Sequence, residues 1–181
     1  MVSILLADGF EESEALITAD ILRRSGVEVM LTGLTGGPVV SSHKVTVVPD
    51  CSIEALAADK LEMLILPGGL GGVSGIESSA PARELIRQCH GKGVYLAAIC
   101  AAPTILANMG YLDDQEAVCY PGMEDQMGSA ICSGAHKVVI ADRIITGEAC
   151  GSTFPFALTL AALLKGDEVA ERVKHEIHYH D

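Results

Sequence analysis

The sequence Val94-Tyr-Leu-Ala-Ala-Ile-Cys-Ala-Ala-Pro-Thr-Ile-Leu106 decides how the rest of the chain is interpreted. An apolar run over 94–99 leads directly to Cys100, and small residues followed by Pro103 then begin a helical pattern. This pattern predicts a buried strand that ends at a cysteine on the turn into a helix. The N–H groups and the dipole at a helix N-terminus favour a reactive thiolate there. The same pattern is consistent with a small thiol that is simply packed in the core.

The composition is that of an ordered globular protein. The chain has 181 residues, of which 49% are hydrophobic and 20% are charged, and its net charge is −12. This length predicts one domain over 1–181, because no linker or change in composition divides the chain. Nucleic acids and anionic membranes are not expected as partners, because both favour clustered Lys and Arg.

The sequence carries no sign of export or of structural metal. Residues 1–8 lack the basic start of a signal peptide, and no apolar run approaches the roughly 18 to 20 residues of a membrane span. The six cysteines are scattered without zinc-site spacing, which predicts reduced thiols and a cytoplasmic location. The late histidines, His175, His178 and His180, are expected to belong to a tail and not to a metal site.

Apolar runs alternate with helical patterns along the chain. This alternation predicts a mostly parallel α/β sheet that is covered on both faces. Strands are expected at 2–7, 27–34, 61–66, 94–99 and 117–120, with hairpins at 39–48 (at a sheet edge) and 137–146. Helices are expected from 11 to 25, after residue 52, and over 80–92, 103–110, 152–164 and 167–175, with a flexible turn at 67–72.

Several residues with chemical potential follow the predicted strands. Glu14 comes after the first strand, Gly68 and Gly69 after the central one, and Tyr120 after a later one. Ligands of a parallel sheet bind at the carboxyl ends of its strands, so these residues are expected to meet near Cys100. The open alternatives are that the early glutamates only complement the helix dipole and that the glycines only form a tight turn. Met123 and Met127 are expected in the core.

Three motifs resemble those of the ThiJ/PfpI superfamily, and more narrowly of its DJ-one/YajL branch. They are Asp8-Gly-Phe-Glu-Glu-Ser-Glu14, Leu66-Pro-Gly-Gly69 and Ala97-Ala-Ile-Cys-Ala-Ala-Pro-Thr104. The resemblance implies a flavodoxin-like three-layer α/β sandwich with a cysteine nucleophile elbow, a homodimer, and no metal or organic cofactor. It also implies roles for individual residues, with Cys100 as nucleophile, Glu14 as its carboxyl partner, Gly69 and Ala101 as backbone N–H donors, and Arg24 at the dimer interface.

The chain departs from the family pattern at three positions. Tyr120 stands where relatives place a histidine, so no Cys–His proton shuttle is expected. Cys150 replaces a proline in a late glycine-containing loop and is expected to approach Cys100, with Gly68, Tyr120 and Gly151 also lining the pocket. His43 replaces an arginine of the early hairpin at the expected interface.

The resemblance implies an enzyme that acts on small reactive carbonyls such as methylglyoxal, as a glutathione-independent glyoxalase or a deglycase. Cys100 and Glu14 would form its catalytic pair, with Glu14 protonated at rest because a carboxylate repels a thiolate. The alternative is a redox sensor or chaperone-like protein in which Cys100 is oxidised to sulfenic or sulfinic acid or is paired with Cys150. A peptidase is not expected, because Ala101 stands where the protease-like branch has histidine.

Overall fold

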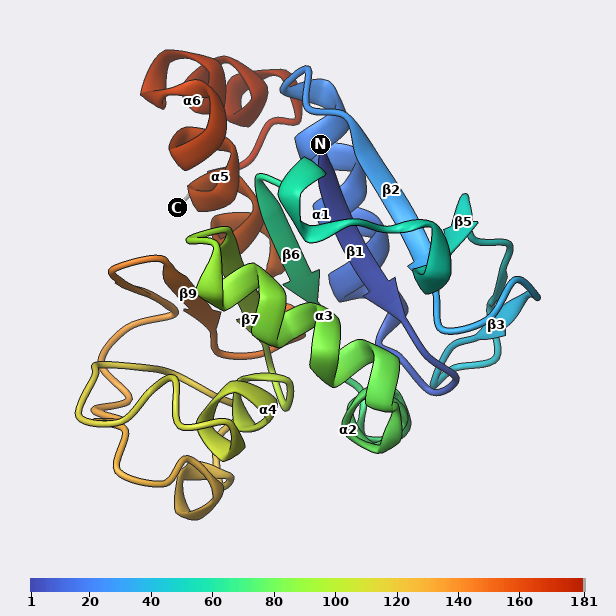
Figure 1. Ribbon diagram of the computed structural model, residues 1–181. Coiled ribbons are helices and arrows are strands. Elements are labelled where there is room, and N and C mark those ends of the chain that lie inside the picture. Colours follow the sequence, from blue (N-terminus) through green and yellow to red (C-terminus); the bar gives the residue numbers. More distant parts are fainter. Residues whose placement is uncertain (181) are drawn as a thin grey trace.

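A computed structural model describes residues 1–180 of the chain and gives a three-layer α/β sandwich (Figure 1). The central sheet has seven strands in the order β5-β2-β1-β6-β7-β9-β8. Every neighbouring pair in it is parallel except β8 and β9, which form an antiparallel hairpin at one edge. Its strands are β1 (Val2–Leu6), β2 (Val29–Gly33), β5 (Cys51–Ser52), β6 (Met63–Leu66), β7 (Tyr95–Ile99), β8 (Val138–Ala141) and β9 (Ile144–Gly147). The predicted fold class is confirmed.

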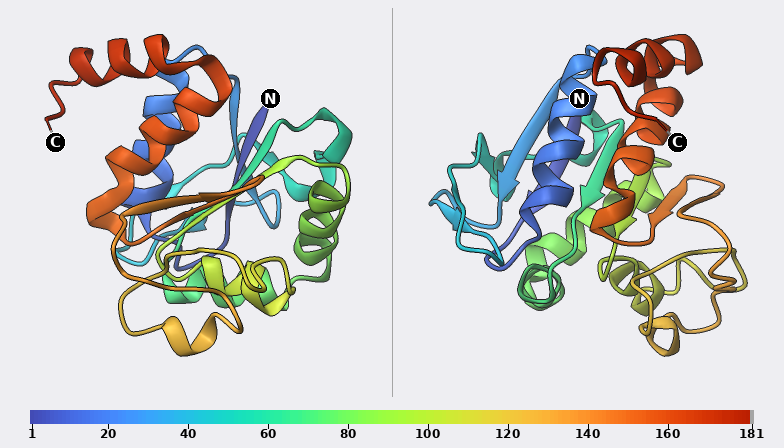
Figure 2. Two further views of the ribbon diagram at one scale, coloured as in Figure 1. Left: turned by 90° about the vertical axis from the view of Figure 1, so that its left-hand side faces the viewer. Right: turned by 180° about the vertical axis from the view of Figure 1, so that it is seen from behind.

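Helices cover both faces of the sheet, as the left view of Figure 2 shows. One layer contains α1 (Glu12–Arg24), α5 (Thr153–Lys165) and α6 (Asp167–Glu176), and α1 and α6 both pack on α5. The other contains α2 (Leu70–Ser78), α3 (Ala80–Gly91) and α4 (Pro103–Asn108). Two large apolar clusters fill the spaces between the sheet and these layers. The central strands are therefore buried on both faces, which is why they appear in the sequence as continuous apolar runs.

Local sequence explains where the helices that frame the site begin. Glu11 caps α1, because its side chain accepts a hydrogen bond from the N–H of Ser13. Ser79 caps α3 in the same way through the N–H of Ala82. Pro103 occupies the first turn of α4, where a missing N–H leaves no partner unsatisfied.

Four sequence predictions of local structure are wrong. The hairpin at 39–48 forms its own two-stranded sheet, β3 (Val39–Val40) with β4 (Thr46–Val47), and does not join the edge of the main sheet. The turn expected at 67–72 ends early, because α2 already begins at Leu70. Residues 117–120 form no strand, although a single bridge joins Glu116 to Ile131 beside them. The helix after residue 52 is only one short 3₁₀ turn, η1 (Ile53–Ala55).

The remaining short 3₁₀ turns are η2 (Ala58–Lys60), η3 (Glu124–Gln126) and η4 (Cys150–Ser152). No helix among residues 1–180 combines the length and the apolar character that crossing a membrane requires.

Candidate functional site

Cys100 lies on a strained turn between β7 and α4. Its φ of +67° belongs to the left-handed region, which residues with a side chain rarely adopt. Two hydrogen bonds hold this backbone in place. The Cys100 N–H donates to the carbonyl of Gly147 (2.9 Å), and the Tyr120 N–H donates to the carbonyl of Cys100 (2.7 Å). The thiol is therefore presented by a rigid elbow, as the sequence predicts.

Glu14 reaches the same point from the first turn of α1. Its side chain is only 1% exposed, and its Oε2 accepts a hydrogen bond from the N–H of Gly68 (2.7 Å). The other carboxyl oxygen, Oε1, is buried without a hydrogen-bond partner. The Cys100 thiol donates a hydrogen bond to this carboxyl group. The two residues thus form a pair whose buried carboxyl group has acceptor capacity left over.

Gly68 makes this approach possible because it has no side chain. A Cβ atom at position 68 would lie 2.7 Å from Cys100 Cβ and 2.8 Å from Glu14 Oε2. It would also lie 3.0 Å from the sulfur itself. Real Cβ atoms do not come this close to their neighbours, so any other residue at position 68 would separate the thiol from the carboxyl group.

Backbone N–H groups of Gly69 and Ala101 point at the sulfur and lower the pKa of the thiol. Gly69 precedes α2 with a φ of +85°, and Ala101 follows Cys100 at the start of the next turn. Paired N–H groups of this kind stabilise negative charge that develops beside them, whether on sulfur or on the oxygen of an adduct. The structure therefore places both donors that the resemblance implies next to Cys100.

The protonation state of Cys100 differs from the expectation that its sulfur is a thiolate. Burial raises the pKa of Glu14 to about 7, with a smaller contribution from the charge of Glu11. Burial and the Glu14 carboxylate raise the pKa of Cys100 to about 12, against the lowering effect of the two N–H groups. At neutral pH the sulfur therefore keeps its proton, and Glu14 is a base of near-neutral pKa in contact with it.

A cavity of about 500 Å³ opens in front of the pair. Its walls contain Gly69, Ala101 and Tyr120 as predicted, together with residues that sequence reasoning did not assign to it: Glu11, Leu70, Pro121, Gly122, Met123 and Gln126. Met127 lies in the core as expected, whereas Met123 is only partly buried. We call residues 120–131 the wall loop, because this segment (yellow to orange in Figure 1) supplies one side of the cavity.

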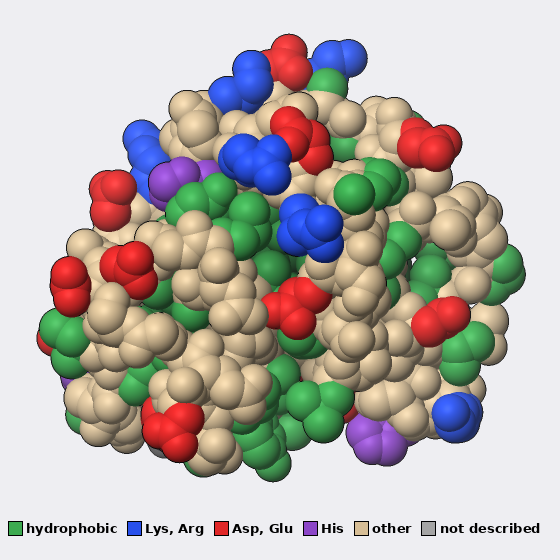
Figure 3. Space-filling view, turned by 60° about the horizontal axis from the view of Figure 1, so that its bottom comes forward, with side chains coloured by type: hydrophobic (Ala, Val, Ile, Leu, Met, Phe, Trp, Pro, Cys, Tyr) green, Lys and Arg blue, Asp and Glu red, His purple; other side chains and the backbone are tan. Residues whose placement is uncertain are grey.

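The lining of the cavity is nearly uncharged, since Glu11 is the only charged side chain that residues 1–180 contribute to it. Figure 3 faces the end of the molecule toward which the parallel strands run, and acidic side chains are spread over it among uncharged ones. Most of the Lys and Arg side chains in that view lie in its upper part. These surroundings suit a small uncharged ligand better than an anion.

Three residues that were expected to line the cavity, Gly68, Cys150 and Gly151, are not part of its walls. Cys150 is exposed on the short turn η4, which leads from β9 into α5, and Gly151 beside it is exposed as well. No contact between Cys150 and Cys100 is found among the described residues, so the expected approach of the two thiols stays a prediction. A sequence pattern places Cys150 at the correct edge of the sheet but does not reveal the path that the chain takes there.

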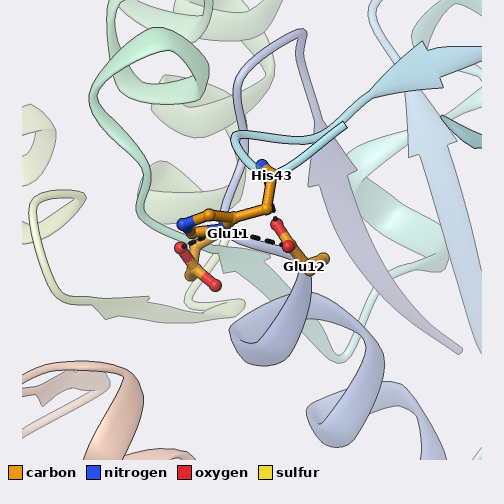
Figure 4. Close-up of side chains that lie close together, drawn as sticks. All are labelled: Glu11, Glu12 and His43. Atoms are coloured by element: carbon orange, nitrogen blue, oxygen red, sulfur yellow. Dashed lines mark hydrogen bonds and ion pairs between the residues drawn. The ribbon is translucent and has the colours of Figure 1, made fainter. Parts of the chain in front are cut away.

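The two residues expected at a dimer interface both contact acidic side chains within the chain. Arg24 pairs with Asp20 (2.7 Å), one helical turn earlier on α1. His43 lies above the start of α1, with its Nδ1 3.0 Å from a Glu12 oxygen and 3.7 Å from Glu11 Oε2 (Figure 4). The three side chains offer one nitrogen and two carboxylate ligands to a cation, but Ser42 also donates to both carboxylates.

The comparisons with known proteins agree with this architecture. The model of the family described as "DJ-1/PfpI family" matches residues 1–163. The chain belongs to the DJ-1/PfpI family. Its similarity to Protein dj-1beta of Drosophila melanogaster reaches 39% identity over 172 residues, covering 94% of this chain and 92% of the relative.

Within the DJ-1/PfpI family, one relative carries the name of an activity. Glutathione-independent glyoxalase DJR-1.2 of Caenorhabditis elegans is 31% identical over 170 residues, covering 91% of this chain and 88% of the relative. The crystal structure of Drosophila melanogaster DJ-1beta superimposes with a TM-score of 0.93 at 36% identity, covering 99% of this chain and 98% of that one. The predicted superfamily and branch are confirmed.

Proposed function

We propose that this DJ-1/PfpI protein converts small 2-oxoaldehydes such as methylglyoxal to hydroxy acids without glutathione. The observation that carries the proposal is the contact between the Cys100 thiol, which lines a nearly uncharged cavity, and the buried Glu14 carboxyl group. The name of the nematode relative supports the same reaction class. The chain offers a nucleophile, a base of suitable pKa and N–H donors within one site.

The first step is addition of sulfur to the aldehyde carbon. As the S–C bond forms, the thiol proton passes to the Glu14 carboxylate, and the carbonyl electron pair moves onto oxygen. The N–H groups of Gly69 and Ala101 stabilise that oxyanion, which then takes the proton from Glu14. The product is a neutral hemithioacetal, and Glu14 is again a carboxylate.

The second stage moves a proton between the two carbons of the substrate. Glu14 removes the C–H proton of the hemithioacetal to give an enediolate and returns it to the neighbouring carbon. The hydroxyl proton moves from the first oxygen to the second, which leaves a thioester on Cys100. Water then cleaves the thioester, which releases the hydroxy acid and restores the thiol. The sum is methylglyoxal plus water to lactate, so no external oxidant or reductant is consumed.

The test is lactate formation from methylglyoxal in the absence of glutathione. We expect the wild type to be active and Cys100→Ser to lose activity by at least about 100-fold, in line with the loss of a covalent nucleophile. Cys150→Ser is the matched control, because it removes an exposed thiol outside the cavity and should leave the rate unchanged. Equal rates in the wild type and Cys100→Ser would refute the proposal.

A redox role for Cys100 is a second candidate, favoured by the N–H groups of Gly69 and Ala101, which suit the oxygens of a sulfinate as well as an oxyanion. The raised pKa of the thiol makes this oxidation slow at neutral pH. The position of Cys150 gives no support to a disulfide with Cys100. Mass spectrometry of Cys100 after mild peroxide treatment separates the candidates, since an unmodified Cys100 would remove the redox role and leave the carbonyl reaction intact.

A further inference from the structure

Cys119 and Cys132 form a second thiol pair, apart from Cys100. Their thiols interact with each other, and Cys132 packs against the apolar cluster that contains Cys119. The other cysteines have different surroundings. Cys51 contacts Thr32 at the far edge of the sheet, Cys89 is buried on α3, and Cys150 is exposed on η4. Among residues 1–180, this is the pair whose thiols contact each other.

The backbone holds the two segments that carry these thiols side by side. A bridge links Glu116 to Ile131, the Ala117 N–H donates to the carbonyl of Ile131 (3.2 Å), and the Ile131 N–H donates to the carbonyl of Gln115 (2.8 Å). Cys119 and Cys132 lie just beyond these contacts. The proximity of the two cysteines in space therefore has a cause in the backbone.

The pair stands at the base of the wall loop. Tyr120, Pro121, Gly122, Met123 and Gln126, which line the cavity in front of Cys100, all lie between the two cysteines in sequence. Tyr120 also binds the Cys100 carbonyl through its N–H, and the Cys119 thiol donates to the carbonyl of Tyr120 (3.6 Å). A covalent link between Cys119 and Cys132 would close a ring around the whole wall loop.

We propose that Cys119 and Cys132 are a peroxide-oxidised dithiol whose reversible disulfide fastens the wall loop of the active-site cavity. Cys132 is the half-buried member and the one that peroxide reaches, whereas Cys119 is only 3% exposed. This assignment does not depend on the carbonyl reaction, because neither thiol contacts Cys100.

The chemistry follows from the difference in exposure. Cys132 sulfur attacks one oxygen of hydrogen peroxide, the O–O bond breaks, and a sulfenic acid and one water form. Cys119 sulfur then displaces the hydroxyl group from the sulfenic acid, giving the S–S bond and a second water. Two thiols have lost two electrons and two protons in total, and peroxide has gained both. A thiol reductant reverses the change by exchange.

The pKa values of the two thiols indicate which of them reacts with peroxide first. Burial raises the pKa of Cys119 to about 12, with smaller contributions from Cys132 and Glu124. Burial raises the pKa of Cys132 as well, with a further contribution from Glu124, but the interaction with the Cys119 thiol lowers it. Cys132 is therefore the better nucleophile of the two and Cys119 the resolving thiol.

The sequence allows a clear readout, because cleavage after glutamate places Cys119 and Cys132 in different fragments that contain no other cysteine. Cys119 falls in 117–124, Cys132 in 125–148, Cys100 in 85–116 and Cys150 in 149–168. After peroxide treatment, alkylation and digestion, we expect 117–124 and 125–148 to be linked with the loss of two hydrogens. The link should disappear with dithiothreitol and be completely absent in Cys132→Ser, while Cys150→Ser retains it.

Hydrogen exchange of the intact protein tests the effect on the wall loop. Exchange in 117–131 should be slower in the oxidised wild type than in the reduced protein, and peroxide should not slow it in Cys132→Ser. A Cys132 that is oxidised to sulfinic acid without the link, or a link that joins other fragments, would overturn the proposal. A correct link with unchanged exchange would overturn the role assigned to the wall loop. Neither readout uses the activity of Cys100, so failure of the proposed carbonyl reaction would be seen separately.

Discussion

Glu12 and Glu14 lie in one turn of α1, and yet their pKa values are shifted in opposite directions. At Glu12, burial is outweighed by hydrogen bonds from its own backbone, Ser41 and His43, which lower its pKa to about 2. At Glu14, burial dominates and raises the pKa to about 7. A carboxyl group becomes a useful base near neutral pH only in the second environment.

The pH dependence of the carbonyl reaction should report the ionisation of Glu14. Because the carboxylate accepts the thiol proton, we expect kcat/KM for methylglyoxal to rise as the pH passes through about 7. Glu14→Gln should remove this rise and most of the activity. Initial rates measured from pH 5 to 9 in both proteins provide the check.

Glu11→Gln offers a sharper control for the same assignment. The charge of Glu11 contributes to the raised pKa of Glu14, so its removal should keep the rise in activity but move it to lower pH. A profile that stays at the wild-type position in Glu11→Gln and survives in Glu14→Gln would mean that another group titrates.

At the scale of elements, the site depends on how closely α2 approaches the turn between β1 and α1. A Cβ atom at Gly72 would lie 2.8 Å from the Cα atom of Phe10, and one at Gly9 would lie 2.8 Å from the Cα atom of Gly71. Glycines on both sides let the two backbones pack directly against each other. This contact fixes Glu14 and Gly69 relative to each other.

Gly72→Ala should therefore destabilise the protein although it places a better helix former within α2. The gain in helix propensity is about 1 kcal/mol, and we expect overpacking against the Phe10 backbone to cost about 1 to 3 kcal/mol. Gly91→Ala at the end of α3 is the matched control, because nothing lies within 4 Å of its added Cβ. Urea unfolding of both variants checks the prediction. A Gly72→Ala protein as stable as Gly91→Ala would show that the contact is not tight.

For the molecule as a whole, burial of Glu14 makes folding stability depend on pH. The pKa of Glu14 is raised from 4.5 to about 7 in the folded state, so folding favours the protonated carboxyl group. This contribution to the free energy of unfolding is complete at pH values below the unfolded pKa of 4.5. That stabilisation is lost as the pH rises through 7, and the total is on the order of 3 kcal/mol.

The free energy of unfolding should therefore fall between pH 4.5 and 7 in the wild type more steeply than in Glu14→Gln. Chemical denaturation at a series of pH values gives both curves, and the comparison concerns their slopes and not their absolute heights. Parallel curves would mean that the pKa of Glu14 is the same in the folded protein as in the unfolded chain.

Most of the sheet could be predicted from the sequence, because the apolar runs of its long parallel strands are buried on both faces. The wrong predictions concern short segments. Val39 and Val47 pair with each other away from the main sheet, and Ala117–Tyr120 follows the elbow without joining a ladder. In such segments the partner depends on the path of the chain and not on the local pattern. The homodimer and the cytoplasmic location stay predictions.

The same distinction holds for the site. Cys100, Glu14, Gly68 and Gly69 could be predicted because each follows a strand whose end is fixed by the sheet. The wall loop and the position of Cys150 could not, since they depend on how irregular segments fold back over that edge. The interaction between Cys119 and Cys132 likewise joins residues that no motif relates.

The hydrogen bond from Tyr120 to Cys100 separates the positioning of the nucleophile from the shape of the cavity wall. The bond uses only the N–H of residue 120, while its side chain is 48% exposed and forms part of the cavity wall. Any residue except proline preserves that bond. Position 120 is therefore a place where substrate preference can drift during evolution, or be altered by design, while the nucleophile stays where it is.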